Sequence, residues 1–420
     1  MIKKGFYKSD FLKSIIQLTT GSLLAQLITI VVSPISTRLY TPEQLGIYSL
    51  ILTITSVFGP IICGKYDLAI VSAKSEKEVA NLILSSAIFA LIFSFIISIG
   101  YSVYLNNNIT IVNEVGVYAY VIILILLVNG LINIASSYNN RQKEYKIISS
   151  VYVTRSFFQN IGLIFFGLLK LGTVGLLISQ LVGSVFGLKK QTKSLYGNKE
   201  IFKSVKLHDI KGEMIKHINQ PLYSMPAHFV NSSSYSILNF FITGLFGMEV
   251  FGYYSMSYRM LGLPLSLVSS NVSKVFFQRA YQEKIDTGSF RRTLKNTTLF
   301  LFALSVPMVL FLMFFSPQIF KFVFGEKWYM SGVYVKILAP MFGIRLIVSA
   351  LTPAVIIAGK QKIELLIQLL FCITSIIMFF ICKIINTEIY IFLKLISISY
   401  SFIYVLFYLL IYKISRDKVE

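Results

Sequence analysis

The chain has 420 residues, of which 55% are hydrophobic and only 14% are charged, and its formal net charge is +21. Soluble domains contain about 25% charged residues, and a soluble chain of this size needs far more polar surface to cover its core. The composition therefore predicts an integral membrane protein. It excludes a soluble enzyme, a disulfide-rich secreted domain and a disordered protein. The three cysteines show neither metal spacing nor a framework of pairs, so no metal site is expected there.

Hydropathy predicts an all-α protein with twelve transmembrane helices, because each needs about 20 mostly apolar residues. The basic N-terminal segment enters the first span directly, and that apolar run is longer than the core of a signal peptide, so we expect an uncleaved helix. The expected spans are roughly 14–38, 43–64, 79–104, 115–138, 147–168, 172–188, 219–245, 250–272, 296–316, 332–357, 363–382 and 388–412.

Lysine and arginine are distributed unequally between the predicted loops. With a cytoplasmic N-terminus, 29 basic residues fall on the cytoplasmic side and five on the opposite side. The positive-inside rule then predicts that both termini are cytoplasmic. Most of the positive charge is explained by topology, with anionic membrane lipid as its expected partner. No nucleic-acid partner is expected.

One long polar segment, Lys189–Lys216, lies at the midpoint of the chain. We predict an N-terminal six-helix lobe at 1–197, a cytoplasmic linker at 198–216 and a C-terminal six-helix lobe at 217–420. His208 and His217 lie in or just after this segment and are expected to be solvated, since no acidic or cysteine ligand stands at metal spacing.

The two halves share a short motif. Glu43–Ser49 and Glu249–Ser255 both read E-x-x-G-x-Y-S, offset by 206 residues, and the first follows a predicted capping box at Thr41–Gln44. Arg141-Gln-Lys143 and Lys360-Gln-Lys362 form a second echo. With six helices in each half, both copies have the same orientation. The sequence thus predicts a parallel repeat about an axis along the membrane normal.

The run from Gly21 through Pro34, Arg38 and Thr41-Pro42-Glu43-Gln44 to Tyr48, followed by Lys65–Ile70, resembles the N-terminal signature of bacterial polysaccharide-biosynthesis flippases. These are the O-antigen and capsule repeat-unit translocases of the multidrug/oligosaccharidyl-lipid/polysaccharide exporter superfamily. The resemblance implies a MATE-like pair of lobes around a central cavity that opens alternately to each side of the bacterial cytoplasmic (inner) membrane. It also implies an undecaprenyl-diphosphate-linked oligosaccharide as substrate and a polysaccharide polymerase as a candidate partner.

Peptidoglycan-precursor flippases share this fold, and their first helix carries an arginine–acid pair in the cavity. No such pair occurs between Ile15 and Ile35 of this chain, which disfavours that branch.

Several predicted helices carry polar residues three or four positions apart, and such a stripe must face another helix or water. A shared wet cavity that binds sugar hydroxyls is one interpretation, and interhelical packing by small and hydroxyl side chains is the other. The candidate sugar-binding residues are Gln26, Asn129, Asn133, His228 and Asn231.

Three arginines fall near mid-depth of predicted spans: Arg155, Arg259 and Arg345. A charge there costs about 2.5–3.5 kcal/mol even on the lenient insertion scale, and it marks a functional site by default. No acid lies at similar depth, so these arginines predict a site for an anion, and the planar guanidinium suits a diphosphate. The alternative is that each arginine pairs with helix carbonyls and supports the fold.

These observations favour a flippase for an anionic lipid-linked oligosaccharide over two alternatives, a multidrug exporter of the same fold and a membrane polysaccharide polymerase. No catalytic residues and no cofactor are expected. Because no glycine-rich phosphate loop is visible, we expect transport to use the membrane potential or a proton or sodium gradient. Asp67, near the cytoplasmic end of the second span, is the coupling candidate.

Overall fold

The computed structural model describes residues 2–106, 119–202, 205, 207–360 and 362–416, and every regular element among them is helical. Ten segments of the described residues are long and apolar enough to cross a membrane. The prediction of an all-α membrane protein is confirmed, whereas the count of twelve spans stays a prediction. The number is ten and not twelve for two reasons. The predicted span 147–168 is too polar to qualify, and the expected spans seven and eight meet in one segment, Ser236–Thr287, which is interrupted at Gly247.

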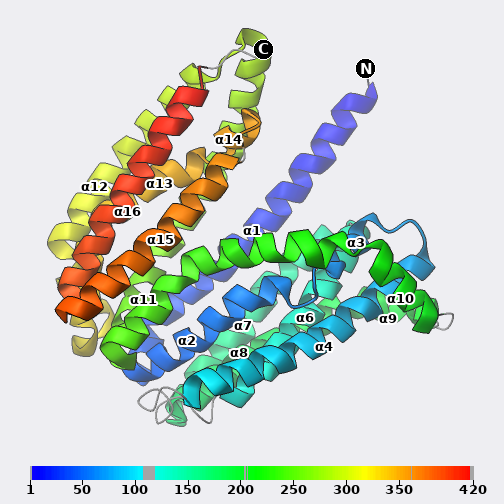
Figure 1. Cartoon of the computed structure of the whole chain (residues 1–420), viewed down its shortest axis with the longest axis horizontal. Coiled ribbons are helices and arrows are strands. Elements are labelled where there is room, and N and C mark those ends of the chain that lie inside the picture. Colours follow the sequence, from blue (N-terminus) through cyan, green and yellow to red (C-terminus); the bar gives the residue numbers. More distant parts are fainter. Residues whose placement is uncertain (1, 107–118, 203–204, 206, 361, 417–420) are drawn as a thin grey trace. The chain divides into compact units, whose positions relative to one another are not determined.

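The chain divides into two compact units, Met1–Ser236 and Ile237–Glu420. Figure 1 shows the helices of both units in sequence colours. The first unit contains α1 (Ile2–Leu39), α2 (Pro42–Phe58), η1 (Gly59–Ile61), α3 (Tyr66–Ser72), α4 (Glu76–Asn106), α6 (Ala119–Arg141), α7 (Tyr145–Leu168), α8 (Gly172–Gln191), α9 (Lys193–Gly197), η3 (Lys199–Phe202), α10 (Leu207–Lys216), η4 (Gln220–Ser224) and the start of α11 (Met225–Thr287).

The second unit contains the rest of α11, followed by helices that pack side by side (Figure 1). They are α12 (Arg291–Phe324), η5 (Glu326–Trp328), α13 (Tyr329–Leu351), α14 (Pro353–Ile357), α15 (Lys362–Ile385) and α16 (Ile389–Ile414).

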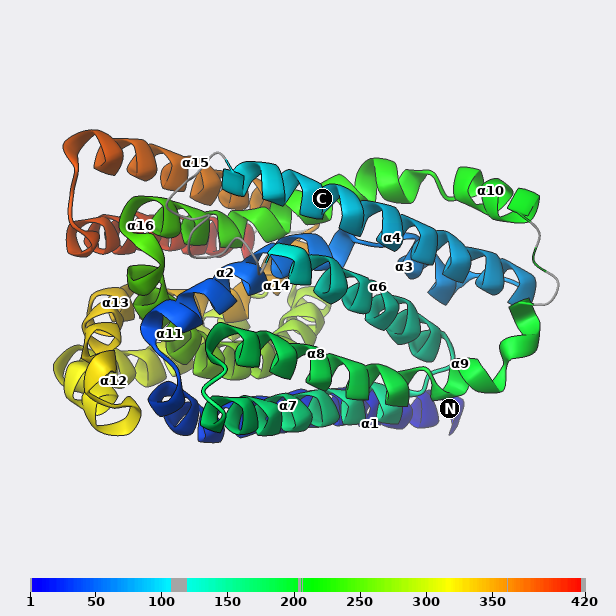
Figure 2. The ribbon, with the colours of Figure 1, turned by 90° about the horizontal axis from the view of Figure 1, so that it is seen from below.

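In the first unit α7 packs between α1 and α8, and these three helices lie side by side in Figure 2. Small residues allow this close approach. A Cβ added at Gly21 would lie 2.2 Å from Ser149 Oγ, and one at Gly162 would lie 3.3 Å from the Ser179 backbone. Such small-residue contacts are typical of helix packing in membranes, where burial of apolar surface does not drive association.

The polar segment predicted as a linker is largely helical. Its helix α10 packs against α4, and the Tyr66 hydroxyl donates to the Met214 carbonyl at 3.2 Å. The first unit continues beyond it into α11, where the rings of Phe58 and Phe229 lie 5.6 Å apart. The segment 198–216 therefore belongs to the first unit by its packing, and the predicted lobe limits stay a prediction.

Both copies of the E-x-x-G-x-Y-S motif begin directly after a break in a helix. At the first, the Gln44 amide donates to Thr41 Oγ1 at 3.3 Å and the Thr41 amide donates to Gln44 Oε1 at 3.1 Å, so the predicted capping box is confirmed. At the second, Gly247 interrupts α11 with φ of 83°, a left-handed value that favours glycine.

Candidate functional site

Arg155 lies at the middle of α7, ten residues after its first residue, Tyr145, and thirteen before its last, Leu168. Its stem lies flat on α8, since a Cβ added at Gly187 would come within 2.2 Å of Arg155 Cγ. The guanidinium is part-buried, and its Nη2 lies 3.5 Å from Ser184 Oγ, the long limit of a hydrogen bond. The glycine leaves room for the stem of Arg155 on α8, while the charged end is only weakly held by that hydroxyl.

One turn beyond Arg155, an amide network joins three helices. Gln159 Nε2 donates to Gln180 Oε1 at 2.5 Å and to the Tyr48 hydroxyl at 3.1 Å, and Tyr48 donates to Gln180 Oε1 at 3.1 Å. Neither glutamine is among the residues predicted from the sequence to bind substrate. The available signals are the four-residue spacings Arg155–Gln159 on α7 and Gln180–Ser184 on α8, because each places two polar groups on one helix face.

The polar stripe of α1 contacts α7 through hydroxyls. Ser156 Oγ donates to the Ala25 carbonyl at 2.7 Å and lies 3.3 Å from Thr29 Oγ1, while Asn160 Nδ2 donates to the Ser156 carbonyl at 2.7 Å. This part of the stripe therefore packs helices together. Gln26 lies beside it, part-buried, and has polar partners of its own.

Asn129 and Asn133 both lie on α6 beside Gly59, at the end of α2. Asn133 Nδ2 donates to the Gly59 carbonyl at 2.8 Å, and a Cβ on that glycine would lie 3.7 Å from Asn129 Nδ2. Asn133 thus satisfies a carbonyl at the helix end. Of the other sugar candidates, His228 is exposed on α11, and the side chain of Asn231 lies outside the described residues.

In the second unit, the Arg345 guanidinium on α13 donates to the Tyr258 hydroxyl of α11. Its carbon lies 5.2 Å from the ring centre of Phe342 and 5.4 Å from that of Tyr258, within cation–π range. Arg259, part-buried, is the next residue after Tyr258 and points about 100° away around the same helix. Arg345 therefore lies in an aromatic setting that α11 and α13 build together.

Asp67 lies in the first turn of α3, between two apolar segments that end at Ile61 and begin at Glu76. It is 5% exposed, and its Oδ1 has no hydrogen-bond partner among the described residues. Burial raises the pKa of this carboxyl, although the nearby ammonium of Lys65 acts in the opposite direction. Asp67 is thus a buried acid with one unsatisfied oxygen.

The expectation for His217 is wrong, because this histidine is not simply solvated. Its Nε2 lies 3.4 Å from Glu78 Oε1 and 3.6 Å from Glu213 Oε2. Glu213 stands four residues before His217, a spacing that could have been read from the sequence, whereas Glu78 comes from a distant helix.

The family model described as "Polysaccharide biosynthesis protein" matches residues 35–332. The teichuronic acid biosynthesis protein TuaB of Bacillus subtilis (strain 168) is 26% identical over 117 residues, a stretch that covers 28% of this chain and 24% of that protein. The chain thus matches about a quarter of the length of this curated relative.

Two solved structures show the same fold at low sequence identity. The lipid II flippase MurJ, in an inward closed conformation, has a TM-score of 0.68 at 16% identity, covering 95% of this chain and 87% of that one. A multidrug resistance MATE family transporter of the MOP superfamily, facing outward, has a TM-score of 0.61 at 14% identity, covering 96% and 95%. With the family model matching well over half of its length, this multi-pass membrane chain belongs to the polysaccharide biosynthesis protein family and has the fold of the MOP superfamily transporters.

Proposed function

We propose that the protein is a flippase that moves an undecaprenyl-diphosphate-linked oligosaccharide repeat unit from the cytoplasmic to the outer leaflet of the bacterial cytoplasmic membrane. The product would supply O-antigen or capsule synthesis by a polysaccharide polymerase. The protein acts as a transporter and not as an enzyme in this proposal, and it needs no cofactor.

The observation that supports this substrate is the sign of the charge within the helices. Arg155, Arg259 and Arg345 each lie well inside a helix, whereas the acids of the described apolar segments, such as Glu78, Glu249 and Glu364, lie near helix ends or the break at Gly247. An arginine fork makes charge-assisted, bidentate hydrogen bonds to phosphate oxygens. A carrier of lipid diphosphates needs such cations within the membrane.

Arg155 is the best placed of the three to bind an anion. Its stem packs against Gly187 and its guanidinium has only the weak contact to Ser184, so a phosphate that binds there would displace only one weak hydrogen bond. The neighbouring amides of Gln159 and Gln180 offer further hydrogen-bonding groups of the kind that bind sugar hydroxyls.

The energy source in this proposal is the membrane potential together with a coupling ion, proton or sodium. An outward-moving anion is favoured by an inside-negative potential by about 2.3 kcal/mol per charge per 100 mV. A proton could act through Asp67, a buried acid with one oxygen lacking a hydrogen-bond partner among the described residues, because burial raises the pKa of its carboxyl. Both termini are cytoplasmic in this arrangement.

A flipping assay tests the proposal. The full chain is reconstituted into vesicles that carry a fluorescent undecaprenyl-diphosphate oligosaccharide, and a membrane-impermeant glycosidase reports how fast the inner-leaflet pool becomes accessible. We expect the wild-type protein to accelerate flipping. The variant Arg292→Ala, which removes one exposed positive charge elsewhere in the chain, should accelerate flipping equally.

The fold similarity to a multidrug transporter makes a drug exporter the second candidate. Efflux of a cationic dye from the same vesicles, without acceleration of the lipid-linked sugar, would establish that alternative and contradict the flippase.

A further inference from the structure

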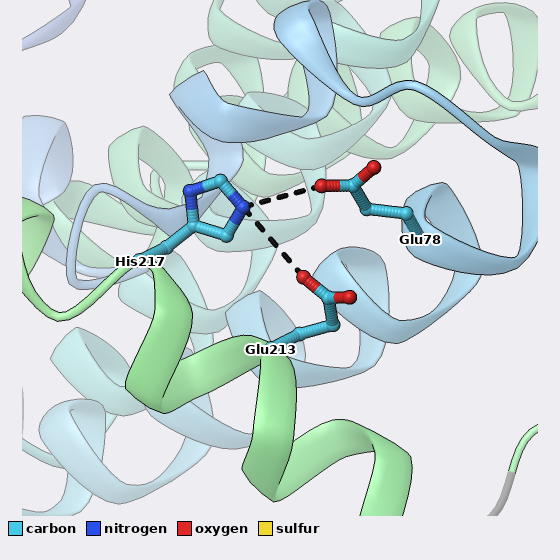
Figure 3. Close-up of side chains that lie close together, drawn as sticks. All are labelled: Glu78, Glu213 and His217. Atoms are coloured by element: carbon cyan, nitrogen blue, oxygen red, sulfur yellow. Dashed lines mark hydrogen bonds and ion pairs between the residues drawn. The ribbon is translucent and has the colours of Figure 1, made fainter.

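A compact cluster of metal-ligand side chains lies within the first unit, away from the arginines. Glu213 and His217 stand four residues apart at the end of α10, and Glu78 comes from the first turn of α4 (Figure 3). Their nearest ligand atoms all lie within 4.8 Å of one another. Figure 3 shows the three side chains converging on one point, with the imidazole Nε2 directed between the two carboxylates.

The distances between these atoms fit tetrahedral coordination. Zn²⁺ binds histidine nitrogen and carboxylate oxygen at about 2.0–2.2 Å, so neighbouring ligand atoms of a tetrahedron lie roughly 3.3–3.6 Å apart. His217 Nε2 lies 3.4 Å from Glu78 Oε1 and 3.6 Å from Glu213 Oε2. Two edges of the tetrahedron are therefore already formed, and the ligand atoms of the two carboxylates lie within 4.8 Å of each other.

The ammonium of Lys216 already contacts both carboxylates of the cluster. Lys216 Nζ lies 2.7 Å from Glu78 Oε1 and 3.1 Å from Glu213 Oε2. Its side chain is 53% exposed, so the flexible stem can leave without opening the core. Two carboxylates and one ammonium sum to one negative charge, whereas two carboxylates and one divalent cation sum to zero.

Glu78 is held in position for such a role. Its side chain is only 9% exposed, and its second oxygen, Oε2, accepts a hydrogen bond from the Lys74 amide at 2.8 Å. Bonds of this kind orient the carboxylates of metal sites.

We propose that Glu78, Glu213 and His217 form a binding site for a divalent transition-metal ion of the Zn²⁺ type, for which the Lys216 ammonium is the competing occupant. A histidine ligand and a three-residue set with room for water favour Zn²⁺ over Mg²⁺ or Ca²⁺, which select oxygen ligands. Bound metal would tie α10 to α4 more firmly than the ion pair does.

Thermal unfolding of the detergent-purified, chelator-treated full chain tests the site, with ZnCl₂ or MgCl₂ as the added salt. A ligand that binds the folded but not the unfolded state stabilises it by RT ln(1 + c/Kd), where c is the free ligand concentration, so the unfolding midpoint rises with ligand concentration and affinity. We expect Zn²⁺, but not Mg²⁺, to raise the midpoint of the wild type. Lys216→Met removes the competing cation, so the Zn²⁺ concentration that gives a half-maximal shift of the midpoint should fall by about tenfold or more.

His217→Gln should abolish the Zn²⁺ shift, while His208→Gln, a change of the exposed histidine on α10, should leave it intact. A Zn²⁺ shift that survives in His217→Gln would place the ion elsewhere and overturn the proposal. So would the absence of any Zn²⁺ shift in both the wild type and Lys216→Met, which would leave the cluster as an ion-pair contact only.

Discussion

Arg155 of the first unit and Arg345 of the second both lie inside helices but have opposite surroundings. Arg155 lies along a glycine face, with its charged end 3.5 Å from a single serine hydroxyl. Arg345 lies against the rings of Tyr258 and Phe342 and donates to the Tyr258 hydroxyl. A buried charge that its neighbours satisfy supports the fold, whereas one that they satisfy poorly is available to a ligand. The depth predicted from the sequence alone does not distinguish the two arginines.

The largest effect on flipping is expected from substitution of Arg155, and it should distinguish this arginine from Arg345. Arg155→Ala should slow flipping about 10- to 150-fold, because it removes a charge-assisted contact worth about 1.5–3 kcal/mol, while its level in the membrane stays normal. Arg155→Lys should rescue flipping only partly, since an ammonium cannot make the fork contact.

Arg345→Ala should instead reduce the amount of folded protein, because it leaves the Tyr258 hydroxyl without this partner inside the membrane. Immunoblots of membranes together with the flipping assay check both variants. If Arg155→Ala and Arg345→Ala lost the same amount of transport at the same membrane level, the different surroundings of the two arginines would not correspond to different roles.

The role of the glycine face can be tested with one methyl group. Gly187→Ala places a Cβ 2.2 Å from Arg155 Cγ, so the arginine must shift. We expect flipping to fall severalfold and the stability to fall by about 1–3 kcal/mol, as for overpacked cores.

Gly262→Ala on α11 is the matched control, since no heavy atom lies within 4 Å of its added Cβ. Alanine there should stabilise the helix by about 0.5–1 kcal/mol without changing transport. Thermal unfolding and flipping rates measure the pair. Unchanged transport in Gly187→Ala would show that the position of the Arg155 stem is unimportant.

The sequence predicts the helical membrane fold because a long apolar segment in lipid must satisfy its backbone hydrogen bonds internally, as a helix does. It also predicts the capping box at Thr41, whose parts are three residues apart. It could not predict the partners that decide the site. Gln159 meets Gln180 across 21 residues and Tyr48 across 111, and His217 meets Glu78 across 139. Such pairs depend on helix packing, which a single sequence does not encode in its local pattern.

The smallest effect concerns Asp67, which extends the comparison of satisfied and unsatisfied charge to a buried acid. Burial raises the pKa of its carboxyl above the ordinary value of 3.8, so ionisation of Asp67 lowers the stability of the folded protein. That penalty is complete above the raised pKa, and it disappears below 3.8, where the carboxyl is protonated in the folded and unfolded chains alike.

Asp67→Asn should therefore be more heat-stable than the wild type at neutral pH, and this advantage should shrink as the pH falls. The exposed Asp286→Asn serves as the control, with little change in the unfolding midpoint at any pH. If Asp67 is the coupling acid, flipping by Asp67→Asn should also lose its response to an imposed proton gradient. Asp67→Asn would fall below the wild type in stability at neutral pH if the attraction to Lys65 outweighed burial, and Asp67 would then be a satisfied charge like Arg345.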